Sequence, residues 1–178
     1  MDVYECIQTK RAVRQFADRP VADEVVARIL MAGRASGSSR NSQPWRFIVL
    51  RDRENLDRLA SFGRYASHVR EAAFAVIVVT ETPKNAFDAG RTAQNMMLAA
   101  WGEGVGSCPV TLHYEDRAKA FLKIPEDRKV PVALVFGYLK EGVKPLIEGK
   151  PRERVLVHLG RKPIEELVFW ERYGQRSR

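Results

Sequence analysis

Three cationic side chains fall within five positions near the N-terminus, at Lys10, Arg11 and Arg14. An arginine guanidinium presents two N–H donors to two oxygens, so this grouping suits a phosphate or another anion. Residues 12–16 read as an extended segment, in which Arg14 shares a face with Ala12 and opposes Arg11. The segment therefore predicts an anion-binding strand at the start of the chain.

Three further stretches carry polar groups in irregular surroundings. The loop at 36–44 offers hydroxyl and amide groups from Ser38, Ser39 and Asn41. Arg161 precedes a predicted helix start, where free N–H groups and the helix dipole favour an anion. The small residues at 106–111 expose backbone that can lie against a planar ligand. Together these features predict a site for a phosphorylated ring cofactor.

The sequence carries no convincing set of residues for hydrolysis or metal binding. Its serines lack the G-x-S-x-G context, and its two cysteines and three histidines complete no zinc pattern. Cys108, with His113 nearby, could be a nucleophile, although an inert buried cysteine is far more common. The glycines at 102–106 follow a helix, whereas a dinucleotide turn must follow a strand. No catalytic side chain is therefore predicted, and a bound cofactor would carry the chemistry.

A long apolar pattern at 88–112 organises the elements that must position this site. One stripe of helical period predicts a buried helix that ends in glycines and runs into a short strand: Ala93, Met96, Met97, Ala100, Trp101 and Gly104. Small residues along this helix would let a second helix approach closely. We expect it at the centre of the core and at a subunit interface.

The other patterns place shorter elements around this helix. They predict helices at 3–10, 21–35, 54–62, 65–72, 114–122 and 163–173, strands at 45–50, 74–80 and 130–138, and an extended segment at 154–159. The β-branched run at 74–80 indicates a strand buried on both faces. Asp116, Arg117 and Lys119 are expected on the outer side of the helix at 114–122. The order fits an α+β or three-layer α/β/α arrangement.

Composition limits the class of protein. A chain of 178 residues with 45% apolar and 29% charged residues predicts one globular domain with a substantial core. The net charge of +8 and pI of about 9.8 favour anionic partners. The apolar runs are too short to cross a bilayer, and the N-terminus lacks a signal-peptide pattern. We therefore expect a cytoplasmic protein with no membrane partner.

The motifs quoted above occur in the order found in the FMN-dependent nitroreductase family, which the chain resembles over nearly its whole length. The matching stretches are KRAVRQF at 10–16, SSRNSQPWRF at 38–47, the helix and glycine turn at 88–107, and GRKP at 160–163. The resemblance implies a nitroreductase-like three-layer α+β fold with a central, mostly antiparallel sheet flanked by helices. It also implies an intertwined homodimer with FMN at the interface.

The resemblance assigns flavin-binding roles to individual positions. Arg11 and Arg14 would contact the phosphate or pyrimidine ring, beside Lys10 and Ala12, and Arg161 would close over the phosphate. The flavin loop and the stretch near the reactive N5 atom supply the remaining residues: Ser38, Ser39, Asn41, Pro109, Val110 and Thr111. Whether His68 or Arg70 reaches the flavin is left open. Residues 1–178 form a single FMN-binding domain in this interpretation, with 140–178 as an extension that embraces the partner.

The chain departs from the family pattern at two positions and in its length. Ala12 replaces the usual serine, which removes a hydroxyl, and Lys10 replaces an arginine, which removes a bidentate fork. Little room exists between 54 and 74 for a substrate-covering insertion, so an open site is expected.

The function implied is hydride transfer from NADH or NADPH through flavin N5 to an electron-poor small molecule, such as a nitroaromatic or quinone. Dehalogenation, flavin fragmentation and dehydrogenation are alternatives on the same fold. A basic nucleic-acid-binding module is a further alternative, but the cations are dispersed and form no recognised motif, so we expect no nucleic-acid partner.

Overall fold

The computed structural model describes residues 2–142 and 159–176. The chain divides into two compact units, Met1–Val143 and Lys144–Arg178. The first unit contains α1 (Val3–Thr9), α2 (Asp23–Arg34), η1 (Ser39–Asn41), β1 (Trp45–Leu50), α3 (Arg53–Ala60), η2 (Ser67–Glu71), β2 (Phe74–Thr80), η3 (Pro83–Asn85), α4 (Ala86–Gly102), β3 (Gly106–Val110), α5 (Glu115–Leu122) and β4 (Lys129–Gly137). The second contains α7 (Ile164–Leu167).

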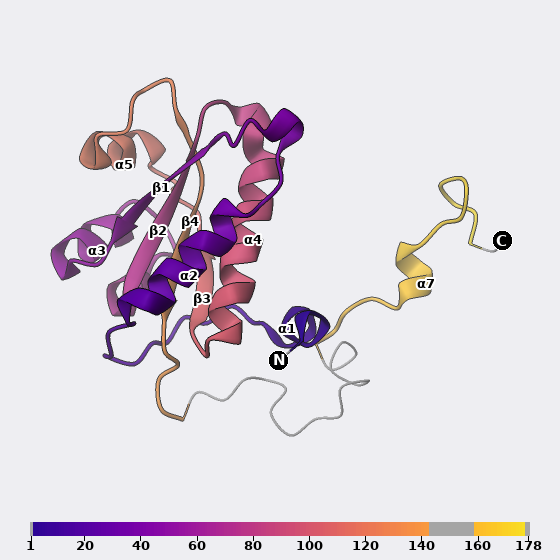
Figure 1. The fold of residues 1–178 in the computed structure, drawn as a ribbon, viewed down its shortest axis with the longest axis horizontal. Helices are drawn as coiled ribbons and strands as arrows, with labels where there is room; N and C mark the ends of the chain where they lie inside the picture. Colours follow the sequence, from indigo (N-terminus) through magenta and orange to yellow (C-terminus); the bar gives the residue numbers. More distant parts are fainter. Residues whose placement is uncertain (1, 143–158, 177–178) are drawn as a thin grey trace. The chain divides into compact units, whose positions relative to one another are not determined.

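The four strands form one sheet in the order β1-β2-β4-β3 (Figure 1). Every pair of neighbouring strands is antiparallel, which confirms the predicted sheet type. β2 lies in the interior of the sheet, and all seven of its residues are buried, as its β-branched composition predicts. β3 is an edge strand, and its free edge is the one that the N-terminal segment meets.

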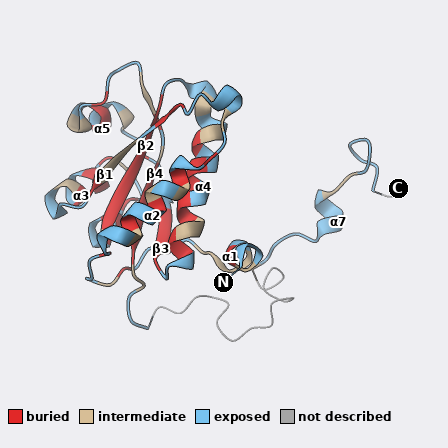
Figure 2. Cartoon of the chain, in the orientation of Figure 1, coloured by how far each residue is buried: buried red, intermediate tan, exposed pale blue. Residues whose placement is uncertain are grey.

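Helices cover both faces of the sheet (Figure 1). On one face α2 and α4 pack over Phe74, Val76 and Val78 of β2. On the other, α3, η2 and α5 pack over Ala75 and Ile77. Alternate residues of β2 thus feed two separate apolar clusters, which gives the predicted three-layer arrangement. Figure 2 shows the buried residues concentrated on the sheet and on the inner sides of α2 and α4.

The central helix matches its apolar stripe, with one difference at its end. Met96, Ala100 and Trp101 are buried on α4. The helix stops at Gly102, so Gly104 belongs to the turn, where its φ of +74° favours a residue without a Cβ. Val105 N then donates to Ala100 O at 2.8 Å, which caps the helix and aims the chain into β3.

Two other predictions were wrong. Lys119 lies in the interior of the fold, not on the outer side of α5: it is 6% exposed, and its Nζ donates to Glu126 O at 2.5 Å. The chain after α5 folds back beneath the helix, so the lysine ammonium satisfies a loop carbonyl there. The helix expected at 163–173 is only α7, because after Leu167 the chain turns so that Trp170 N donates to Gln175 O at 2.7 Å.

Two further expectations concern the C-terminal part of the chain. The extended segment expected at 154–159 lies outside the described residues except for Leu159, which is in a turn. That 140–178 embraces a partner stays a prediction. Within the described ranges, no helix is both long enough and apolar enough to cross a membrane.

Candidate functional site

The N-terminal cationic segment is held against the free edge of the sheet. Ala12 forms a parallel bridge with Ser107, and Val13 N donates to Ser107 O at 2.9 Å. Further along, Phe16 bridges Leu139 in the antiparallel sense. Val13 is buried whereas Ala12 and Arg14 are exposed, as the alternation of an extended segment predicts. Arg14 therefore projects from a segment whose backbone is fixed.

Two glycines allow this segment to lie so close. A Cβ on Gly106 would be 2.9 Å from Val13 Cβ, and one on Gly137 would be 2.9 Å from Phe16 Cδ1. Real Cβ atoms do not approach that closely, so larger residues would push the segment away from the sheet. The sequence pattern at these positions thus sets the distance between Arg14 and β3.

The segment brings two cations to a buried thiol and a histidine. Lys10 and Arg14 both lie near Cys108 of β3, and Arg14 also lies near His68 of η2. Burial lowers the pKa of Lys10, and the adjacent Arg11 adds to that shift. Burial raises the pKa of the Cys108 thiol, and Arg14 and Lys10 only partly oppose it. Burial thus favours the neutral thiol of Cys108, which is the less reactive form.

The two cations of this cluster, Lys10 and Arg14, form no ion pair with the described part of the chain, residues 2–142 and 159–176. The Nε2 atom of His68 is buried, and none of those residues supplies it with a hydrogen-bond partner. Buried polar atoms nearly always have partners, so cations without an ion pair beside such an atom fit an anionic, polar ligand. A flavin phosphate or pyrimidine edge meets that description.

The stretch expected beside the flavin ring is the end of β3. Pro109 and Thr111 are exposed and Val110 is buried, so the first two share an open face. The turn at 61–66 supports this stretch closely. A Cβ on Gly63 would lie 2.9 Å from Thr111 O, and Tyr114 N donates to Phe62 O at 3.0 Å. The turn at 61–66 thus supports the backbone of Pro109 to Thr111, which would face the ring.

The expected flavin loop is shaped by its own hydrogen bonds. Ser38 Oγ accepts from Gln43 N at 2.9 Å, and Arg40 and Asn41 both have positive φ angles, of 52° and 54°. Ser39 and Asn41 are exposed and Ser38 is half-buried. The loop therefore presents its polar groups outward.

Within one chain the loop and the cationic segment lie at different ends of α4 (Figure 1). The loop contacts the helix at Arg91 and Asn95: Asn95 Nδ2 donates to Ser36 Oγ at 2.8 Å and Gly37 abuts Arg91. The cationic segment contacts the C-terminal end, where Trp101 Nε1 donates to Thr9 Oγ1 at 2.9 Å. The helical rise places Trp101 roughly 9 Å beyond Asn95 and roughly 15 Å beyond Arg91. One chain does not bring both parts together.

The structure does not assign the two other expected arginines, Arg11 and Arg161, to this cluster. The Arg11 guanidinium donates to Gln8 O at 2.6 Å and Lys10 O at 2.5 Å, so it caps the end of α1. Arg161 is exposed in the second compact unit. Their roles toward a cofactor stay predictions.

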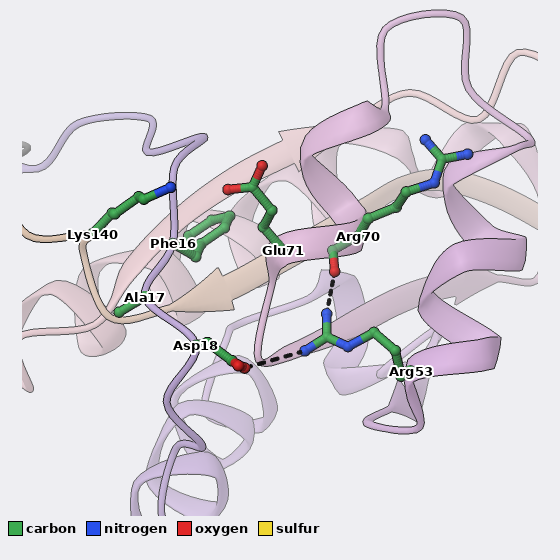
Figure 3. Close-up of a pocket in the computed structure, with 7 residues that line it drawn as sticks. All are labelled: Phe16, Ala17, Asp18, Arg53, Arg70, Glu71 and Lys140. Atoms are coloured by element: carbon green, nitrogen blue, oxygen red, sulfur yellow. Dashed lines mark hydrogen bonds and ion pairs between the residues drawn. The ribbon is translucent and has the colours of Figure 1, made fainter.

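A pocket of about 370 Å³ adjoins the site but contains none of the expected flavin residues. Figure 3 shows the residues that line it: Phe16, Ala17, Asp18, Arg53, Arg70, Glu71 and Lys140. Arg53 pairs with Asp18 at 4.0 Å and donates to the carbonyl oxygens of Arg70 and Ala72. The Arg53 guanidinium therefore interacts with groups of the protein itself. The Arg70 guanidinium points away from Asp18, so Arg70 contributes backbone to this pocket (Figure 3).

His68 is the residue that sequence reasoning left undecided and that the fold brings to the cluster. No motif marks it, because it lies on a short 3-10 helix whose place depends on packing against α3. In the sequence, His68 is seen only as a histidine a few residues before a fully buried strand. That arrangement is too common to indicate a functional role.

The pKa of His68 is lowered from its ordinary value of 6.5, first by burial and second by Arg14. Below pH 6.5 the unfolded chain then binds more protons than the folded one, so stability falls as the pH drops. We expect the free energy of unfolding, from urea titrations between pH 5 and 7.5 without cofactor, to decline less steeply toward acid in His68→Gln. An unchanged decline would show that His68 titrates normally.

Comparisons with known proteins agree with this geometry. The family model for the Nitroreductase family matches residues 7–72 and 61–138. A Methanothermobacter thermautotrophicus protein, 32% identical over 152 residues that cover 79% of each chain, carries the provisional name NADH dehydrogenase/NAD(P)H nitroreductase.

Solved structures with the same fold include flavin proteins. A provisionally named nitroreductase from Desulfovibrio desulfuricans, solved in complex with FMN, is 27% identical, covers 97% of this chain and 98% of its own, and has a TM-score of 0.78. An FMN-dependent nitroreductase from Clostridium difficile is 25% identical over 80% of this chain and 90% of its own, with a TM-score of 0.74. The family model covers most of the first compact unit, and this chain therefore belongs to the nitroreductase family.

Proposed function

We propose that this chain is an FMN-dependent oxidoreductase that moves a hydride from NADH or NADPH to an electron-poor acceptor such as a nitroaromatic or quinone. The observation that carries the proposal is the cluster of Lys10 and Arg14, which form no ion pair with the described residues, beside the orphaned Nε2 of His68, at the end of a braced strand. FMN, when bound, supplies an N5 atom that accepts and donates hydride. The chain supplies binding, orientation and charge.

Each part of the site has a separate task in this proposal. Arg14 and Lys10 face the pyrimidine edge of the ring system, where their charge stabilises the extra electron density of the reduced flavin. Pro109, Val110 and Thr111 line the ring, and the support from Gly63 keeps that backbone in place. The open face at Pro109 and Thr111 leaves room for a planar donor or acceptor to stack.

The proposal includes a second copy of the chain. The loop with Ser38, Ser39 and Asn41 lies far along α4 from the cations, so a partner's loop would have to complete the site. α1 supports such an assembly, because Val3, Tyr4 and Ile7 are 74%, 68% and 52% exposed on a single short helix. Exposed apolar side chains of this kind mark contact surfaces. Light scattering on the purified protein should give twice the chain mass.

The test of the main proposal is spectroscopic. Purified protein should bind FMN, be yellow, and lose its flavin absorbance when NADH or NADPH is added without oxygen. Addition of a quinone or nitroaromatic should then restore the colour. A protein that neither retains nor binds FMN would contradict the proposal. Reduced protein that is reoxidised by halogenated aromatics but not by quinones would favour dehalogenation instead. The cytoplasmic location and the absence of nucleic-acid partners remain predictions.

A further inference from the structure

His68 carries a feature that the proposed function does not use. It is half-buried on η2, and its Nε2 lacks a hydrogen-bond partner among the described residues. The ring also forms a hydrogen bond with the backbone of Tyr65. A neutral histidine nitrogen in this position is an unused acceptor, and a protonated one would be an unused donor. The arrangement suggests that the missing partner comes with a ligand.

The surroundings of His68 favour its neutral form. Burial and Arg14 of the N-terminal segment both lower its pKa, and the backbone of Tyr65 and the Glu71 carboxylate of its own helix only partly oppose them. Beyond Arg14 lie Lys10 and Cys108.

The helix packed against η2 does not change this balance. The charged side chains of α3 nearest to η2 are Arg53 and Asp57, which pair with Asp18 and Arg70 at 4.0 and 3.9 Å. Those charges are compensated, so Arg14 and Glu71 are the charged groups that act directly on His68.

We propose that His68 takes up a proton at Nε2 when the flavin bound in this cluster is reduced, and releases it when the flavin is reoxidised. This inference rests on the proposed function. Burial and the Arg14 charge disfavour imidazolium, and an added negative charge beside the ring favours it. His68 would thereby couple proton uptake to electron uptake.

The electrons and protons balance in both directions. The donor's hydride brings two electrons and one proton to the flavin, which gains one negative charge. A solvent proton forms the new N–H bond on His68, so the cluster's net charge is unchanged. On reoxidation the hydride leaves with the acceptor and the Nε2–H bond breaks. A quinone needs one hydride and one proton, so the histidine proton completes its reduction.

The test measures the flavin midpoint potential against pH on the FMN-loaded protein, by spectroelectrochemistry from pH 5.5 to 8.5. Wild type should take up two protons per two electrons between the two pKa values of His68. His68→Gln should take up one fewer, so its slope should be shallower by about 30 mV per pH unit. His68→Lys should share the shallow slope at a higher potential. His113→Gln, which alters another histidine whose Nδ1 accepts from Arg64 N at 3.2 Å, should keep the wild-type slope.

A second readout follows the proton itself. The chain has three histidines, so His68 can be assigned in nitrogen-resolved NMR spectra by comparison with His68→Gln. Its pKa should rise when the loaded protein is reduced by dithionite. Equal slopes in wild type and His68→Gln, even with altered FMN affinity, would overturn the inference and leave the proposed function intact. Failure of wild type to bind FMN would overturn both.

Discussion

Replacing Arg14 by alanine should weaken the binding of FMN by ~1.5–3 kcal/mol, the range for a hydrogen bond to a charged group. That corresponds to about a ten- to hundredfold higher Kd. Arg14 is exposed, faces no carboxylate ion pair in the described chain, and stands on a segment whose backbone is fixed by Ser107 and Leu139. Its loss should therefore remove a ligand contact without disturbing the fold. Fluorescence titration of the apoprotein with FMN measures the change.

The control is another arginine of the same unit. Arg128 is half-buried, and among the described residues it pairs with the surface carboxylates Glu81 and Asp127, at 3.7 and 3.8 Å. Arg128→Ala should leave the FMN Kd unchanged, and such pairs contribute little to stability. Arg161→Ala should resemble Arg14→Ala if Arg161 closes over the phosphate. Unchanged affinity in both Arg14→Ala and Arg161→Ala would mean that the phosphate lies elsewhere.

Replacing Phe16 by alanine should lower both the stability of the fold and its affinity for FMN. Phe16 is 3% exposed and packs against Gly137, which leaves room for its ring. Truncating a buried phenylalanine costs about 3–5 kcal/mol of unfolding free energy. Because Phe16 also fixes the segment that carries Arg14, a loosened segment should bind FMN more weakly.

Phe74→Ala separates the two effects. Phe74 is fully buried and stacks on Phe136 at 4.7 Å between ring centroids, so its truncation should cost a similar amount of stability. It should leave the FMN Kd of the folded fraction unchanged. If Phe16→Ala does not fold, Phe16→Leu should fold and still bind FMN more weakly than wild type. Equal FMN affinity in wild type and Phe16→Leu would show that the segment does not depend on this ring.

The elements that sequence patterns predicted best are those set by local composition. The strand expected at 74–80 is β2, because its six consecutive apolar residues, 74–79, cannot be buried on only one side. The helix at the centre of the chain was recognised from its stripe. Lys119 was misplaced because a charged residue on a helix is usually solvated, and only the loop that folds back beneath α5 supplies its acceptor.

The site was predictable in parts and not as an assembly. The spacing of Lys10 and Arg14 predicts an anion-binding site. The parallel bridge between Ala12 and Ser107 places these two residues beside β3. That bridge pairs residues far apart in sequence, which no local pattern reveals. The role of His68 depends on the same long-range packing, so its contribution could be seen only in three dimensions.

The buried interior strand has a consequence for how the chain is made. β2 pairs on one side with β1, which precedes it, and on the other with β4, which begins at Lys129. At about 5–20 residues per second, the ribosome needs roughly 2–10 s to add the intervening residues. During that time an apolar edge of Val and Ile lies open, the composition most prone to cross-β association. Slower synthesis of the stretch between β2 and β4 should increase aggregation more than slower synthesis elsewhere.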